Sequence, residues 1–403
     1  MSLLVLRAML FASSTLLFDM EAETAHLPLA QAALMLMNWV PEPPAIPSPV
    51  PYRTWLSLAI HRAKLVNAHR HAGICDVGTT ANEPQSRTLR RLWWCCIICD
   101  RLSSLICRFR LQITPDMLDM ENYVPLDFAD LQSEIHRSNV FSPATKRQLI
   151  SLFSKYLGLL MLLTELIPVA YLFETRLESS PDFSDTAKAE FPPFHQLKAA
   201  EESDSVNYVA VHTNLMYIYY HTSCIALCNR RVFTQISGIG SPDFHRGDYE
   251  DGDRSNEIRG DIEDSVLGVS KCIGSLTGSH LTKYLPITVI GCLAISLALH
   301  HINTGLSYEG EVVPSHLKGW PLFGLDLMHK HLQVVVDAAD TFSAQYYGSQ
   351  WVKEAAEHVA KLAKSFNKLS LQSGQEAMKD WVDILVRISG NIFGPCVDCR
   401  HVR

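Results

Sequence analysis

Apolar residues recur at helical spacing along almost the whole 403-residue chain. Besides shorter stripes before residue 140, the pattern predicts helices at about 143–178, 205–233, 258–283, 285–303, 324–346 and 350–391. Runs that alternate polar and apolar residues between turn signals are scarce, and neither a β-α-β rhythm nor a repeat is visible. The sequence therefore predicts an all-α fold, a large multi-helix domain.

Polar segments rich in Ser, Pro, Asp and Glu divide these helices into two halves. We expect an N-terminal helical half at residues 1–177, a loop at 178–204, a C-terminal helical half at 205–391 and a tail at 392–403. Residues 241–264 carry nine acidic residues against three arginines. Such a charge run is typical of a solvated segment, so we expect a mobile acidic loop there.

Composition excludes several classes of protein. Lys and Arg total 35 and Asp and Glu total 42, a net charge of −7 that gives the chain as a whole no electrostatic attraction to nucleic acid. With 47% hydrophobic and 19% charged residues, wholesale disorder is excluded. The eleven cysteines are odd in number and lie mostly in apolar segments, which favours buried thiols in a reducing compartment over a secreted disulfide framework.

Three apolar stretches invite comparison with membrane segments. The first 20 residues resemble a signal peptide only faintly, because Arg7 interrupts the apolar run instead of preceding it. Residues 285–302 are roughly long enough to span, but they lack basic flanks, so a helix buried by protein is the preferred interpretation. Lys155 and Glu165 divide the stretch at 149–173, which is therefore not interpreted as a span. The sequence predicts no membrane association.

No catalytic motif is found. No GxxxxGK[ST] or GxGxxG follows a predicted strand, and GxSxG and HExxH do not occur. Asp127-Phe-Ala-Asp130 is half of the aspartate-rich Mg²⁺ motif of terpenoid synthases, without its partner. The sequence therefore predicts no catalytic residues and a protein that is not an enzyme.

Metal-binding patterns are incomplete. Three groups of candidate ligands occur: His69, His71 and Cys75; Cys96 and Cys99; and Cys396, Cys399 and His401. A structural zinc site needs four ligands, and none of these groups supplies them. We expect thiols inside an apolar helix at 96 and 99, thiols of a tail at 396 and 399, and no metal site.

One helix, beginning near Thr88, combines an apolar surface with charge. It is apolar on nearly every side, yet it contains several arginines and the pair Asp100-Arg101. Burying an ion lowers the stability of the fold by roughly several kcal/mol unless an opposite charge or hydrogen-bonding groups surround it. We therefore expect Asp100 and Arg101 to be buried and paired with another helix. A nucleic-acid interpretation of the six arginines between 87 and 110 is weaker, because interleaved Trp and Ile indicate burial.

Motifs on and around this helix resemble a known family. They are Gln31…Asn38-Trp39; Trp55…Ala59-Ile60…Ala63…His69-Arg70; Arg87-x-x-Arg90-Arg91-Leu92-Trp93-Trp94; Asp100-Arg101-Leu102; Leu111-x-Ile113; Asp116…Asp119…Val124-Pro125; and, more loosely, Tyr217…His221 through Arg230 and Leu285-Pro286. In this order they are similar to the fungal-specific transcription factor domain, the middle homology region of zinc binuclear-cluster activators, in its cutinase transcription factor-like branch. Arg90, Arg91, Trp93, Trp94, Asp100 and Arg101 form its structural signature here.

The resemblance implies a nuclear transcription regulator that works through effector sensing or partner docking. Implied partners are other transcription proteins, a homodimer partner or a small-molecule effector, with DNA contacted only indirectly or through upstream residues. Family members carry an N-terminal Zn₂Cys₆ cluster, and this sequence has none, so no cofactor is expected. Either the chain is a lone regulatory domain or its gene model lost the 5′ exons.

One local departure from the family pattern remains, and three alternative interpretations stay open. Where the family has Gly-Arg-Pro or Arg-Arg-Pro after the signature helix, this chain has Arg108-Phe109-Arg110, so the local turn is expected to differ. The alternatives are an all-α enzyme with an unrecognised site, a non-functional truncated family member, and an integral membrane protein using residues 285–302.

Overall fold

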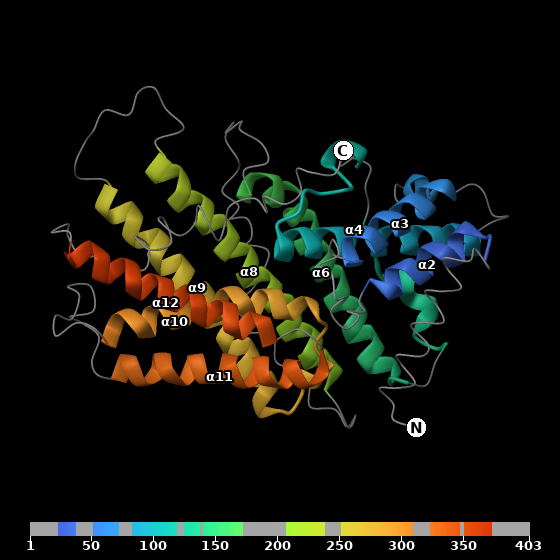
Figure 1. Cartoon of the computed structure of the whole chain (residues 1–403). Helices are drawn as coiled ribbons and strands as arrows, with labels where there is room; N and C mark the ends of the chain where they lie inside the picture. The colour runs from blue at the N-terminus through green and yellow to red at the C-terminus, as the bar shows by residue number, and fades with distance from the viewer. Residues whose placement is uncertain are drawn as a thin grey trace. The chain divides into compact units, whose positions relative to one another are not determined.

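The computed structural model describes residues 23–37, 51–71, 83–118, 125–137, 140–171, 207–237, 251–308, 323–346 and 350–372. Within these ranges the chain forms ten α-helices and no β-strand (Figure 1). The predicted all-α fold is confirmed. Its physical basis is the 3.6-residue apolar period, which only helices can bury on one side.

The chain divides into two compact units, and the first comprises residues 1–104 with 111–164. Its described elements are α2 (His26–Leu36), α3 (Pro51–Leu65), α4 (Glu83–Cys107) through Ser104, α5 (Phe128–Leu131), α6 (Pro143–Ala170) through Thr164, and the short 3₁₀ turns η1 (Ala68–His71), η2 (Pro115–Met117) and η3 (Gln132–Glu134). Helix α2 packs along α3, where Arg62 Nη1 lies 3.2 Å from His26 Nδ1. The alanines Ala30, Ala33, Ala59 and Ala63 are fully buried, which allows this close approach.

The second unit comprises residues 105–110 and 165–403. Its further described elements are α8 (Tyr208–Ser237), α9 (Asp251–Gly278), η5 (Thr282–Tyr284), α10 (Thr288–Tyr308), α11 (Phe323–Gln345) and α12 (Gln350–Gln372). Helix α8 packs along α9, and α10 contacts α8, α9, α11 and α12, so α10 is the central helix of this unit (Figure 1). Tyrosine hydroxyls link these helices: Tyr219 bonds Thr288 at 2.6 Å, and Tyr346 donates to the Leu285 carbonyl at 3.0 Å.

The predicted acidic loop at 241–264 is wrong for its described part. Residues 251–264 form the first half of α9. The reason is that Ile262 is buried and begins an apolar face that continues one helical turn apart with Val266 and Val269, whereas the acidic Asp264 is exposed on another side of the helix. Residues 1–22, 178–204, 241–250 and 373–403 lie outside the described residues, and the predictions made for them stay predictions.

One helix in the described part of the chain, α6, is long and apolar enough to cross a membrane by length and composition alone. Lys155 and Glu165 lie within it, and half of its most apolar window is buried inside the protein. A core helix passes the same test. Within residues 285–302, the other candidate span, α10 contributes the shorter apolar helix Thr288–Ile302.

The turn after α4 forms without the glycine or proline that the resembling family has there. Arg108 takes the left-handed backbone conformation, with φ of 56°, that glycine adopts most easily at a helix C-terminus. Its guanidinium lies 5.4 Å from the centre of the Tyr171 ring, and the Tyr171 hydroxyl donates to the Leu105 carbonyl at the end of α4. Tyr171 thus caps the helix and holds the side chain of the strained residue.

Close helix packing in the second unit predicts opposite effects for two glycines. A methyl group at Gly291 on α10 would overlap the branched side chain of Ile106, whereas one at Gly260 on α9 meets no atom within 4 Å. We expect Gly291→Ala to lower the free energy of unfolding by about 1–3 kcal/mol, since the β-branched side chain of Ile106 has few alternative rotamers in a helix. Gly260→Ala should raise it by about 0.5–1 kcal/mol. Urea unfolding followed by circular dichroism measures both, and equal effects would contradict this packing.

Candidate functional site

The candidate site is the set of signature side chains on α4. Trp93 and Trp94 have no exposed surface. His69 of η1 packs its ring against Trp93, with the ring centres 5.7 Å apart, and His71 bonds the Ser86 hydroxyl at 3.0 Å. The second and third sequence motifs therefore meet beside the buried Trp93, and the bond of His71 links η1 to the first turn of α4.

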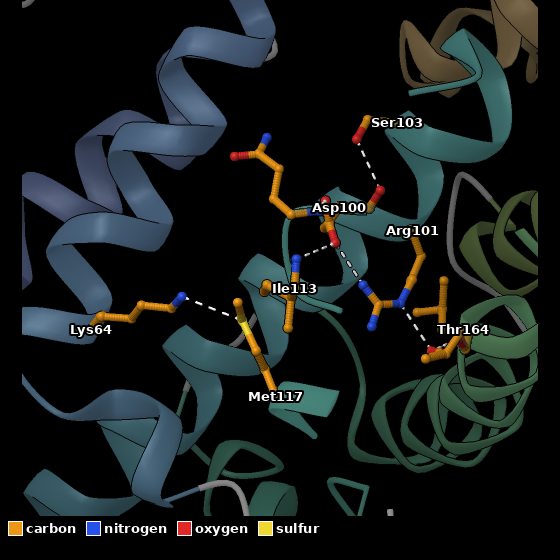
Figure 2. Close-up of polar contacts among 9 residues, drawn as sticks. Lys64, Asp100, Arg101, Ser103, Ile113, Met117 and Thr164 are labelled. Carbon is orange, nitrogen blue, oxygen red and sulfur yellow. Dashed lines mark hydrogen bonds and ion pairs between the residues drawn. The ribbon is translucent and has the colours of Figure 1, made fainter. Parts of the chain in front are cut away.

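Asp100 and Arg101 form a buried ion pair, with exposed side-chain fractions of 1% and 0%. Arg101 Nη1 donates to Asp100 Oδ2 at 2.6 Å, and Arg101 Nε donates to the Thr164 hydroxyl of α6 at 2.9 Å (Figure 2). Adjacent helical residues point in different directions, so the long arginine side chain must turn back to reach its neighbour. The predicted burial of both residues is confirmed. Arg101 bonds another helix as predicted and ties α4 to α6, but for Asp100 the prediction is wrong, because its carboxylate pairs with Arg101 of its own helix.

Asp100 also determines the path of the chain beyond α4. Its carboxylate accepts the backbone N–H of Gln112 at 3.0 Å and of Ile113 at 3.0 Å (Figure 2). Ile113 is fully buried and Leu111 is nearly so. Burial raises the pKa of Asp100, and Arg101 and the two N–H donors each lower it in opposition. The carboxylate thereby satisfies two backbone donors of a segment that has no regular secondary structure.

Arg90 and Arg91 hold the segment that contains α5 and η3. Arg90 donates to Asp130 Oδ1 at 3.2 Å and to the Pro125 carbonyl at 3.2 Å. Arg91 donates to Glu134 Oε1 at 2.8 Å and to the Asp130 carbonyl. Glu134 bonds Arg137 as well, and these bonds lower its pKa, with the Arg91 bond contributing most. The arginine pair therefore fastens this segment to α4.

The half-motif Asp127-x-x-Asp130 is a helix cap. Asp127 Oδ1 accepts the Asp130 N–H at 3.0 Å, and Asp130 Oδ2 accepts the Asp127 N–H at 3.1 Å, which is a reciprocal capping box. Asp130 in addition binds Arg90. Both carboxylates are thus occupied by structural bonds at the start of α5.

Metal-ligand groupings of three or more His, Cys, Asp or Glu side chains are absent from the residues that the structure describes. Cys96 is buried and Cys99 partly buried, and burial raises the pKa of Cys99 to about 12 and that of Cys96 well above its usual value. Both are thiols rather than thiolates at neutral pH. Cys75, Cys396, Cys399 and His401 lie outside the described residues.

Sequence reasoning missed the partners of the signature residues. Thr164 is a fully buried hydroxyl in the apolar helix α6, 63 residues from Arg101. The available signal was a hydroxyl next to Glu165 in an otherwise apolar part of the helix. Glu134 and Asp130 belong to a short acidic stretch, and nothing in their spacing pointed to the arginines of α4.

Comparison with known proteins decides the family. A family model described as the fungal specific transcription factor domain matches residues 6–223, more than half of the chain and all six signature residues. The chain belongs to this family. The family is one of transcription factors, and the resemblance seen in the motifs is confirmed.

Among curated proteins, the chain is similar to cutinase transcription factor 1 beta of Fusarium vanettenii. The two are 22% identical over 334 residues, which cover 73% of this chain and 36% of the relative. The chain thus matches about a third of the length of that protein. No solved structure matches the chain.

For this fungal transcription factor domain, the ion-pair geometry predicts that Asp100→Asn is strongly destabilising. Asparagine has one acceptor oxygen for three donors and leaves the Arg101 charge buried without its counter-ion. We expect a loss of about 3–5 kcal/mol in the free energy of unfolding, measured in urea. Glu134→Gln is the matched control, because that carboxylate is 37% exposed and should cost less than about 1 kcal/mol. Similar losses of stability in both variants would contradict a buried ion pair between Asp100 and Arg101.

The burial of Trp93 makes a second prediction. Trp93→Ala should cost about 3–5 kcal/mol, because it leaves a large cavity in the core of the first unit. Met35 of α2 is 77% exposed, and Met35→Ala should change the unfolding free energy by less than about 0.5 kcal/mol. Thermal unfolding of both variants tests this, and a loss under about 1 kcal/mol for Trp93→Ala would contradict the placement.

Proposed function

We propose that this chain regulates transcription through its helical domain, by sensing an effector or docking a partner rather than by catalysis. Family membership supports the class of function. The observation that carries the mode of action is that the signature charges are used to hold the scaffold: Arg90, Arg91, Asp100 and Arg101 are each bonded to other parts of the first unit. They are thus not available as a shared reaction centre.

We further propose that the chain acts in the nucleus and reaches promoters through a DNA-reading module on a partner protein or on another segment of the same protein. Partners would be other transcription proteins or a second copy of the chain, and a small-molecule effector is a further candidate. That the chain carries no cofactor stays a prediction.

The arginines between 87 and 110 support indirect rather than direct DNA contact. Arg90, Arg91 and Arg101 donate to carboxylates, carbonyls or a hydroxyl, and Arg108 lies over an aromatic ring. Sequence-specific binding needs a reading element in a groove and several exposed phosphate contacts. Four of the six arginines in this stretch are engaged within the protein instead.

The DNA prediction follows from this engagement and from the net charge of −7. The 403-residue chain should bind duplex DNA no better than nonspecifically, with Kd of roughly 10⁻⁴ to 10⁻⁶ M at physiological salt. Electrophoretic mobility shift with promoter fragments measures it. A shift at nanomolar protein that resists competitor DNA would show direct reading and would point to the α4 arginines as the surface.

The regulatory function is tested by fusing the chain to an unrelated sequence-specific DNA-binding module and measuring a reporter gene in a fungal host. We expect the fusion to raise or lower reporter output severalfold relative to the module alone. Trp93→Ala in the fusion should abolish the change by unfolding the domain, and Met35→Ala should not. A folded, DNA-bound fusion that leaves the reporter unchanged would contradict the proposal.

A further inference from the structure

A buried histidine connects three helices in the second unit. His300 on α10 is 3% exposed, and its Nε2 lies 2.8 Å from the Ser270 hydroxyl on α9. Its ring is stacked on that of His331 on α11, with the ring centres 6.5 Å apart and the planes inclined by 9°. Ser270, His300 and His331 together form a cluster, the histidine junction.

The protonation state of His300 follows from its partner. The Ser270 hydroxyl donates its single hydrogen to the Val266 carbonyl at 3.0 Å. Ser270 therefore accepts from His300, which places a hydrogen on Nε2 of the neutral ring. A second proton would add at Nδ1 and leave the ring positively charged in the core.

Several of the groups around the junction are basic. His331 on α11 and His301 on α10 both oppose a positive charge on His300. Lys271 on α9 acts in the same way on His331 and on His221 of α8. Lys353 and Lys364 of α12 lower the pKa of His301, and the carboxylate of Glu357 raises it. A proton on His300 would thus be buried beside groups that repel it.

These surroundings make the second unit sensitive to acid. Burial, together with His331 and His301, lowers the pKa of His300 from its usual 6.5 to about 4, and burial with Lys271 lowers the pKa of His221 to about 4. The unfolded chain binds more protons than the folded chain between pH 6.5 and 4. The stability that the neutral His300 and His221 contribute is therefore fully present above about pH 6.5 and is lost as the pH falls toward about 4.

We propose that the histidine junction is an acid-sensitive switch, in which protonation of His300 separates α9, α10 and α11. Each buried imidazole should raise the equilibrium constant for opening by up to about tenfold for each pH unit below 6.5. The opened state would expose the apolar faces that α10 now buries, including Val289, Leu293 and Leu297.

Hydrogen–deuterium exchange of the full chain tests the switch. With rates corrected for intrinsic exchange, peptides from α9–α11 should lose protection between pH 7 and pH 5. His300→Gln keeps an N–H donor for Ser270 but cannot be charged. For each pH unit below 6.5, the equilibrium constant for opening should therefore rise by up to about tenfold less in this variant than in the unsubstituted chain. His358→Gln on α12 is the control, since His358 is exposed and the substitution should leave the unsubstituted behaviour intact. The same pH dependence with and without His300 would overturn the proposal.

A second measurement keeps the test valid if His300→Gln does not fold. In the unsubstituted chain labelled at histidine, the His300 ring resonance should not titrate between pH 7 and pH 5.5 while α10 remains protected from exchange. A His300 ring that titrates near pH 6.5 in the protected state would show that its charge is accommodated and would overturn the proposal.

Discussion

An ion pair buried in an otherwise apolar helix is the constraint on which the first unit depends. Removing Asp100 and Arg101 from water costs roughly several kcal/mol for each ion. Their mutual attraction offsets this cost only when the remaining donors and acceptors also find hydrogen-bond partners. Thr164 of α6 and the backbone N–H groups of Gln112 and Ile113 are such partners. The pair therefore determines both where α6 lies against α4 and how the chain turns after α4.

The same logic extends along α4 to Arg90 and Arg91. These two side chains hold the segment with Asp130 in α5 and Glu134 in η3, so the charged residues of the signature link α4 to other elements of the first unit. A family motif of this kind identifies a fold. The rest of the sequence would then be free to differ, consistent with the 22% identity between this chain and cutinase transcription factor 1 beta.

The spacing of apolar residues along the chain predicted the features that depend on neighbouring residues. Apolar periodicity located the helices, and the apolar surroundings of Asp100 and Arg101 predicted their burial, because an ion in such a helix has few other places to go. The partners could not be predicted, since Thr164 and the amides of residues 112 and 113 come into contact only through the tertiary fold. The acidic composition of 251–264 led to the wrong prediction of a loop, because this stretch is the start of a helix whose apolar face, from Ile262 to Val266, is buried. The left-handed Arg108 depends on Tyr171, which is distant in sequence.

The most direct test of the structural role of the signature is a double-mutant cycle between Asp100 and Arg101. The free energy of unfolding would be measured in urea for Asp100→Leu, for Arg101→Met and for the double variant. If the pair is a buried brace, each single variant leaves an uncompensated charge, and the double variant should be more stable than the sum of the single losses by about 1.5–3 kcal/mol. Losses that add to within about 0.5 kcal/mol would show that the two charges do not depend on each other and would contradict the account.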